Sequence, residues 1–282
     1  MKQEIINLYD EYTHAPLSRQ VFLKRLAVLA GGTAAAMALL PLLENNYARA
    51  AVTPQDDLLT EYITYPGKPN EMKAYVARPR ENKKYSAIIV IHENRGLNAH
   101  IEDVTRRAAR AGYLAIAPNA LSALGKSFSN EDEARAAFSE LNAEDTLQNF
   151  MGAFDYISKR EDCNGRVGCI GFCWGGGMSN NLAVRVPELK AAVAFYGRQP
   201  AGEEVANIKA AVQLHYASLD DRINAGIPAY EEALKKYKVR YELYMYEGVN
   251  HAFHNDTSGA RYNEAAAKLA WQRSLDFFKK YV

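Results

Sequence analysis

The sequence predicts an α/β protein whose mostly parallel, doubly wound sheet is covered by helices on both faces. From residue 57 onward, short apolar segments of strand chemistry alternate with segments of helical spacing, and such alternation is typical of βαβ units. The segment SAIIVIH (86–92) is apolar at almost every position, as a strand buried on both faces requires. We therefore predict one domain built around a central sheet.

The predicted elements follow in chain order. LLTEYITY (58–65) and MKAYVAR (72–78) are expected to pair antiparallel across the turn PGKPNE. Further strands are expected at 86–92, 113–119, 165–172, 190–197, 210–217 and 239–247. Helices are expected at 99–111, 130–142 and 143–160, from near Trp174, Glu203 and Gly226, and at 261–281. In such sheets, reacting groups lie at the carboxyl ends of the strands.

Composition limits the classes of partner. The chain has 282 residues, 48% of them hydrophobic, which is enough for a sizeable core. Its formal net charge is +1 without basic blocks, which argues against nucleic acid or an anionic membrane and favours a small molecule. Cys163, Cys169 and Cys173 are too few for a disulfide framework and lack zinc-site spacing. We expect no metal and no organic cofactor.

The first 50 residues are predicted to be an export signal, and 51–282 the α/β domain. A basic stretch (17–25) precedes an apolar, small-residue run (26–43) and the AxA signal that ends at Ala50. This order is typical of a signal peptide, so cleavage near Ala50 and a periplasmic or secreted protein are expected. A membrane anchor is the alternative, although glycines and a proline interrupt the apolar run.

The basic stretch resembles a twin-arginine export signal. Arg19 occupies the first arginine position, but Gln20 replaces the second. The resemblance implies the export machinery as a partner and no stable membrane partner after cleavage. The protein would remain cytoplasmic if Gln20 disables the signal.

Three predicted strand ends carry a nucleophile, an acid and a base. Cys173 lies in GFCWGGG (171–177), Asp220 and Asp221 follow the strand at 210–217, and His251 follows the strand at 239–247. The order matches that of the α/β-hydrolase arrangement, in which a glycine-flanked nucleophile comes first. An imidazole can remove the thiol proton of a cysteine, and a carboxylate can orient that imidazole. Each residue alone also fits a packing, capping or loop role, but their joint placement favours catalysis.

Five segments together resemble the dienelactone hydrolase (carboxymethylenebutenolidase) family of α/β hydrolases, in which cysteine replaces the usual serine. The resemblance covers about 58–282. It is carried by IVIHENRGLN (89–98), GFCWGGG (171–177), FYG (195–197), ASLDDRI (217–223) and GVNHAFHN (248–255). The family implies the α/β-hydrolase fold and hydrolysis of a small ester or lactone through an acyl-enzyme intermediate.

The resemblance also implies residue roles. Cys173 would be the nucleophile, His251 the base and Asp220, rather than Asp221, the acid. Glu93 matches a carboxylate near the resting cysteine that helps to generate the thiolate when substrate arrives.

The backbone N–H groups of Asn94 and Trp174 would form the oxyanion hole. Tyr196, Phe253 and His254 would line the substrate pocket.

Two arginines that bind the substrate carboxylate in the founding lactonases are missing. One of these positions holds Asn255, and the other lies in NALSALGKS (119–127), which contains no arginine. We therefore do not expect a dienelactone with a free carboxylate as substrate, unless Arg95, Arg198 or Arg222 substitutes.

Two other functions remain open at this point. A catalytically idle binding protein would keep the fold but would have an unreactive Cys173. A redox protein would pair Cys173 with Cys169 or Cys163, although four residues of extended chain separate Cys169 from Cys173.

Overall fold

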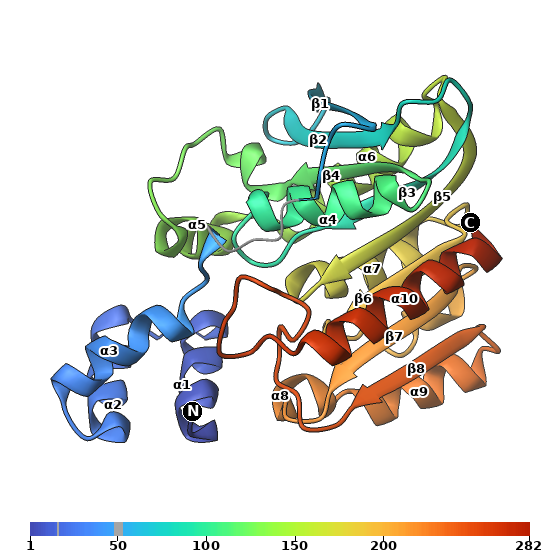
Figure 1. The fold of residues 1–282 in the computed structure, drawn as a ribbon. Coiled ribbons are helices and arrows are strands. Elements are labelled where there is room, and N and C mark those ends of the chain that lie inside the picture. Colours follow the sequence, from blue (N-terminus) through green and yellow to red (C-terminus); the bar gives the residue numbers. More distant parts are fainter. Residues whose placement is uncertain (16, 48–52) are drawn as a thin grey trace.

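An eight-stranded sheet forms the centre of the part of the chain that the structure describes (Figure 1). The structure is a computed structural model and describes residues 1–15, 17–47 and 53–282. The strand order is β1-β2-β4-β3-β5-β6-β7-β8. The pairs β1–β2 and β2–β4 are antiparallel, and the other neighbours are parallel. The strands are β1 (Leu58–Tyr65), β2 (Met72–Pro79), β3 (Tyr85–Ile91), β4 (Leu114–Asn119), β5 (Cys163–Phe172), β6 (Ala191–Phe195), β7 (Ala211–Ala217) and β8 (Tyr241–Tyr246).

Helices cover both faces of this sheet. On one face lie α4 (Ala99–Arg110) and α10 (Glu264–Tyr281), which share an apolar cluster with β3 and β6. On the other face lie α6 (Ala143–Ser158), α7 (Trp174–Arg185) and α9 (Ile227–Lys236). Short helical turns complete the fold: η2 (Ala120–Leu124), α5 (Glu131–Ala137), η3 (Phe138–Glu140), η4 (Glu204–Asn207) and α8 (Asp221–Asn224). The predicted α/β fold class is confirmed.

Local sequence signals explain most element boundaries. β3 is buried at every position except Ser86, because both of its faces pack against helices. The last helix begins at Glu264, three residues later than predicted, since the Asn263 side chain accepts a hydrogen bond from the Ala266 N–H and caps it. The helix expected near Glu203 is a single 3-10 turn.

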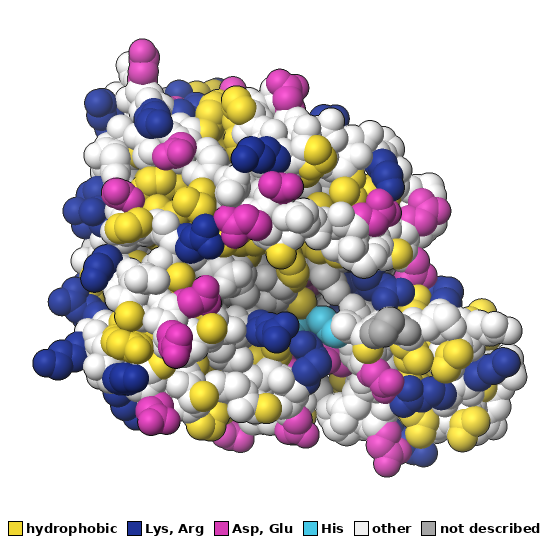
Figure 2. All heavy atoms as spheres, turned by 180° about the vertical axis from the view of Figure 1, so that it is seen from behind, with side chains coloured by type: hydrophobic (Ala, Val, Ile, Leu, Met, Phe, Trp, Pro, Cys, Tyr) yellow, Lys and Arg dark blue, Asp and Glu magenta, His cyan; other side chains and the backbone are white. Residues whose placement is uncertain are grey.

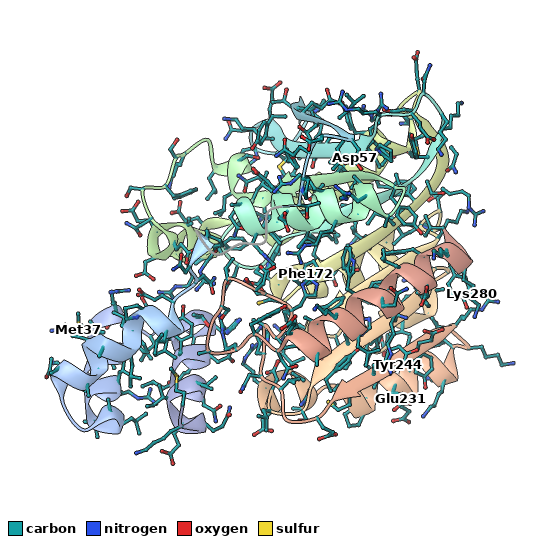
Figure 3. The ribbon with its side chains drawn as sticks, viewed as in Figure 1. Met37, Asp57, Phe172, Glu231, Tyr244 and Lys280 are labelled. Carbon is teal, nitrogen blue, oxygen red and sulfur yellow. The ribbon has the colours of Figure 1, made fainter. Side chains whose placement is uncertain are left out.

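Three further helices form an N-terminal lobe beside the carboxyl ends of the strands (Figure 1). They are α1 (Gln3–His14), α2 (Arg19–Ala30) and α3 (Thr33–Leu43). The lobe has its own apolar cluster, in which Tyr12 and Phe22 stack with ring centroids 4.4 Å apart. Figure 3 shows Met37 on the side of this lobe away from the sheet and Phe172 at the end of β5.

The prediction that residues 1–50 are an export signal stays a prediction. Its cleavage signal, Ala48-Arg49-Ala50, lies outside the described residues. Among the described residues, no single helix is long and apolar enough to cross a membrane; α2 and α3 pass that test only together, with a bend of 111° between them.

Candidate active site

Cys173 occupies a strained turn between β5 and α7. Its backbone has φ 56° and ψ −116°, a conformation that residues other than glycine rarely adopt. The turn is held by a hydrogen bond from the Cys173 N–H to the Phe195 carbonyl, 3.0 Å long. A Cβ on Gly171 would lie 1.9 Å from the Gly175 carbonyl oxygen, and one on Gly175 would lie 2.4 Å from the Ile91 carbonyl oxygen. Glycine is therefore required at both positions for strand and helix to approach this closely.

Asp220 and His251 form a buried pair on the neighbouring loops. Asp220 follows β7 and also caps α8 through the Ile223 N–H. Its Oδ2 lies 2.5 Å from His251 Nδ1, and both residues are less than 5% exposed. Asp221, the alternative acid, is exposed. One ring nitrogen of His251 lies within 4.8 Å of Cys173 Sγ, so the three predicted triad side chains meet at one point.

A second histidine contacts the same sulfur. His14, the last residue of α1, places its Nε2 3.2 Å from Cys173 Sγ. Its Nδ1 lies 3.2 Å from Asp10 Oδ1, one helical turn earlier. Sequence reasoning missed both residues because it assigned them to an export segment. The available signal was the Asp10–His14 spacing of four, which puts both side chains on one helix face.

The surroundings of Cys173 favour its thiolate. Burial raises the pKa of this thiol, but the neighbouring His14 and His251 lower it, and the resulting pKa is about 6. Burial lowers the pKa of His251, yet Asp220, Asp10 and the Cys173 thiolate raise it well above its ordinary value. The two histidines therefore favour the thiolate, and the thiolate in turn favours a protonated His251.

Glu93 is held by two hydrogen bonds, and its predicted role in generating the thiolate stays a prediction. Glu93 is buried; its carboxylate accepts hydrogen bonds from Asn255 Nδ2 at 2.8 Å and from the Tyr196 hydroxyl at 3.3 Å. Burial raises its pKa, but the charges of Arg261 and other cations outweigh this effect and lower it. Within the described residues, the carboxylate makes no hydrogen bond with Cys173, because Tyr196 and Asn255 hold it.

A cavity of about 740 Å³ opens beside Cys173, a size that suits a small-molecule ligand. Asn94 and Trp174, whose backbone N–H groups were predicted to form the oxyanion hole, both line it. Trp174 is the first residue of α7, where backbone N–H groups have no partner within the helix. The wall is completed by Thr13, His14, Ala15, Leu17, Ser18, Arg135, Ala136, Phe138, Ser139, Tyr196, Arg198, Arg222, Ile223 and His251.

Basic side chains stand at this cavity. Figure 2 shows a hollow where the N-terminal lobe meets the body of the protein, with Lys or Arg and a histidine at its rim. Arg198 is exposed and, among the described residues, makes no side-chain hydrogen bond or ion pair. Arg222 lies 3.6 Å from Asp10. Of the three arginines considered as substitutes, these two line this cavity.

Three predicted pocket residues lie elsewhere. Arg95 is bound to Glu131 at 3.1 Å and lines a different cavity. Phe253 is completely buried, and His254 stacks on Phe172 with ring centroids 4.8 Å apart. The chain turns inward after His251, where Ala252 adopts φ 63°, so these two side chains enter the core. Their prediction as residues lining the pocket is wrong.

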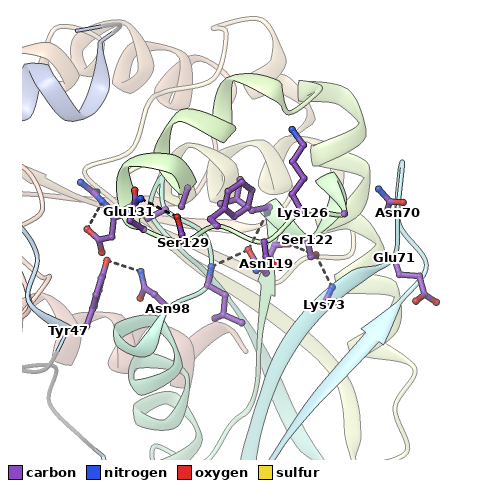
Figure 4. A pocket seen from close by; sticks show the side chains of 18 residues that line it. Tyr47, Asn70, Glu71, Lys73, Asn98, Asn119, Ser122, Lys126, Ser129 and Glu131 are labelled. Carbon is purple, nitrogen blue, oxygen red and sulfur yellow. Dashed lines mark hydrogen bonds and ion pairs between the residues drawn. The ribbon is translucent and has the colours of Figure 1, made fainter. Parts of the chain in front are cut away.

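The cavity that contains Arg95 is shown in Figure 4. Its volume is about 750 Å³, and Tyr47, Asn98 and Glu131 contribute to its wall. Its described lining contains no cysteine and no histidine. It therefore lacks the nucleophile and base that the Cys173 cavity combines.

The remaining cysteines are separate from the site. All three cysteines are free thiols. Cys169 lies 3.0 Å from the Ser179 hydroxyl, and burial raises its pKa to about 12. One atom each from His14, Cys173 and His251 lie within 4.8 Å of one another, a set that could hold a soft metal ion. The expectation of a site that needs no metal stays a prediction.

The mostly parallel sheet, the strained turn after β5 and the adjoining cavity are those of an α/β hydrolase. The sequence profile described as "Dienelactone hydrolase family" matches residues 72–282. A "Putative carboxymethylenebutenolidase" of Saccharolobus solfataricus is 34% identical over 256 residues, which cover 77% of this chain and 97% of the relative. The chain therefore belongs to the dienelactone hydrolase family.

Further relatives agree with this assignment. A protein of Escherichia coli K12 with the same description is 31% identical, and the match covers 81% of this chain and 90% of that relative. The crystal structure titled "Putative Dienelactone Hydrolase" from Klebsiella pneumoniae is 28% identical, with a TM-score of 0.73. It covers 79% of this chain and 99% of that protein. The chain is a hydrolase of this family, and its residues before 72 lie outside the match to the family profile.

Proposed function

We propose that this hydrolase cleaves a small ester or lactone, with Cys173 as nucleophile and His251 and Asp220 as its acid–base pair. The observation that carries the proposal is the buried Asp220–His251 pair, 2.5 Å apart, beside a cysteine held on a strained turn at a cavity. A histidine oriented by a carboxylate can move protons to and from the reacting atoms.

The reaction proceeds in two halves. The Cys173 thiolate adds to the carbonyl carbon, and its oxygen becomes an oxyanion beside the N–H groups of Asn94 and Trp174. The C–O bond breaks, and the leaving alkoxide takes a proton from His251. Water then attacks the thioester while His251 accepts one of its protons, and the C–S bond breaks to release the acid and the Cys173 thiolate.

The test compares the full chain with its Cys173→Ala variant on p-nitrophenyl acetate, p-nitrophenyl butyrate and simple lactones. Cys163→Ala is the matched control, because Cys163 lies at the opposite end of β5. Turnover lost only in Cys173→Ala, with iodoacetamide labelling at Cys173, is the expected result. Full turnover in Cys173→Ala would refute the proposal.

Two alternatives have distinct results in the same experiment. A binding protein would turn over none of these substrates, and its Cys173 would resist iodoacetamide. A redox protein would show fewer free thiols before reduction than after it.

A further inference from the structure

Among the described residues, two histidine–carboxylate pairs adjoin the sulfur of Cys173. His251 pairs with Asp220 and His14 with Asp10, and both imidazoles approach the sulfur of Cys173. His14 comes from α1, which precedes the residues that match the family profile (72–282). Its role therefore has to be derived from this chain.

Hydrogen bonding fixes which ring nitrogen of neutral His14 carries the proton. The Nδ1 atom lies 2.8 Å from the Asp10 carbonyl oxygen. A carbonyl oxygen can only accept, so Nδ1 carries a proton and donates it. In neutral His14 the Nε2 atom is then the bare, basic nitrogen, and it is this atom that lies 3.2 Å from Cys173 Sγ.

His251 is differently placed. Its Nδ1 is bound to Asp220, whereas its buried Nε2 has no hydrogen-bond partner among the described residues. An imidazole nitrogen with no bond to the protein is free to exchange protons with a substrate or with water. The two histidines therefore differ: Nε2 of His14 contacts the sulfur, whereas Nε2 of His251 is available to a substrate or to water.

The N-terminal lobe forms a wall of the site and does not fill it. Thr13, His14 and Leu17 line the cavity beside Cys173, and about 740 Å³ remains open. A segment that blocked the enzyme would occupy this space. Substrate-sized room is instead left between the lobe and Trp174.

Specific contacts fix α1 on the body of the protein. Arg261, which is 3% exposed, lies over the Tyr9 ring at 4.9 Å and 3.8 Å from Asp10 Oδ1. Without α1 this guanidinium would lose both of these partners. The Asn94 side chain also donates to the Thr13 carbonyl at 2.8 Å, adjacent to His14.

We propose that His14 is a further catalytic residue, whose Nε2 takes the proton from Cys173 Sγ and holds the resting enzyme as a thiolate–imidazolium pair. This inference rests on the proposed function. The resemblance to the family implied that Glu93 helps to generate the thiolate when substrate arrives. In this proposal His14 generates the thiolate instead. His251 is left to serve the leaving group and the water.

The protons balance in this scheme. One proton moves from sulfur to His14 before substrate arrives and stays there through the cycle. His251, already protonated, gives its proton to the leaving alkoxide and regains one from the attacking water. The net reaction is ester plus water to acid plus alcohol. His14 acts throughout as the counter-ion of the thiolate.

The proposal requires α1 in the active enzyme. Removal of residues 1–50 by cleavage near Ala50 would also remove His14. The predicted cleavage and this role therefore exclude each other, although export of the uncleaved chain does not conflict with it.

The experiment measures the rate of iodoacetamide alkylation of Cys173 against pH in the full chain, which requires no substrate. His14→Gln keeps a polar side chain with an N–H donor but cannot carry the charge. Asp10→Asn keeps His14 and removes the charge that supports its protonation. Glu4→Ala, an exposed change on the same helix, is the matched control. The charged and titratable groups around His14 are Asp10, Cys173, Asp220, Arg222, His251 and Arg261.

The expected result is a shift of the alkylation midpoint upward by at least about one pH unit in His14→Gln, which is about tenfold slower labelling below the midpoint. In Asp10→Asn the alkylation midpoint should shift upward by a smaller amount, and in Glu4→Ala it should equal that of the wild type. Hydrogen exchange of α1 amides reports whether the helix remains docked.

Three results would overturn the proposal. The first is an alkylation midpoint in His14→Gln equal to that of the wild type. The second is a shift in His14→Gln that accompanies loss of α1 protection while Asp10→Asn titrates as wild type, since this indicates a structural role alone. The third is an intact mass showing that the active protein in its producing organism begins at Ala51.

The two proposals fail separately. Ester turnover with an unshifted His14→Gln would refute the role of His14 and keep the hydrolase function. Shifted alkylation without turnover of any ester or lactone would refute the proposed function and keep the thiolate–imidazolium pair.

Discussion

The imidazole rings of His14 and His251 meet edge to face, with their centroids 4.6 Å apart. They come from positions 237 residues apart in the chain, since 251 − 14 = 237. Each has a carboxylate at Nδ1 and lies beside Cys173. This arrangement joins the N-terminal lobe to the site that the family fold provides.

Replacing the buried acid should abolish most of the activity. In Asp220→Asn the charge that stabilises the His251 imidazolium is lost, and we expect kcat to fall by about 10³- to 10⁴-fold. Asp221→Asn, an exposed neighbour, is the control and should keep full activity. The measurement is steady-state hydrolysis of a p-nitrophenyl ester. Equal losses in both variants would contradict the assignment of Asp220.

Arg198 should favour substrates that carry a negative charge. Arg198 lines the cavity, and among the described residues its side chain makes no hydrogen bond or ion pair. A charge-assisted hydrogen bond to a substrate carboxylate would stabilise binding by about 1.5 kcal/mol or more. Arg198→Ala should therefore raise KM about tenfold for an anionic ester and leave a neutral ester of equal size unchanged.

Arg185→Ala is its matched control, because Arg185 lies on α7 and is bound to Glu144 outside this cavity. An unchanged ratio of anionic to neutral KM in Arg198→Ala would show that this arginine does not contact the substrate.

The close approach at the nucleophile turn should make Gly171 intolerant of a side chain. A Cβ there would lie 1.9 Å from the Gly175 carbonyl oxygen, so the backbone has to move. We expect Gly171→Ala to lower the free energy of unfolding by about 3 kcal/mol or more. Gly202→Ala, with no atom within 4 Å of the added Cβ, should change it by less than about 0.5 kcal/mol. Urea denaturation of both variants measures the difference, and similar values would contradict the prediction.

Acid should destabilise the fold through His92. Its Nδ1 donates to the Glu93 carbonyl and its Nε2 accepts from the Ala120 N–H, which fixes a neutral ring. Burial lowers its pKa to about 4, below the ordinary value near 6.5. The unfolded state therefore binds a proton first as pH falls. Stability from this group is present above about pH 6.5 and is lost toward pH 4, by about 3 kcal/mol.

His92→Gln tests this acid dependence, because glutamine supplies one donor and one acceptor but does not titrate. The free energy of unfolding, measured by urea denaturation between pH 7 and 4.5, should fall less steeply in the variant. Identical slopes in the two proteins would show that His92 is not the responsible group.

The positions of the strands were predictable because each is marked locally. A continuous apolar run such as that of β3 reports burial on both faces, whatever the rest of the chain does. The chemistry at the ends of β5, β7 and β8 followed from the same logic, since parallel strands bring their carboxyl ends to one edge. Cys173 and His251 were named on that basis, whereas the choice of Asp220 over Asp221 came from the resemblance to the family.

The pocket walls were less predictable. Phe253 and His254 follow His251 directly, but the turn at Ala252 directs them into the core. Arg95 is adjacent in sequence to Asn94, yet it binds Glu131 in the neighbouring cavity. Sequence proximity to a catalytic residue says little about which way a loop side chain points.

By itself, the sequence determined the sheet, the order of the reacting groups and the glycines that the nucleophile turn requires, because these depend on local periodicity and local sterics. Only the tertiary structure decided that α1 packs against the strand ends and brings His14 to Cys173. That contact joins residues 159 positions apart and depends on the docking of one helix through Tyr9, Asp10 and Arg261. No local pattern encodes such a long-range contact, since it arises from shape and charge complementarity between two separately formed parts.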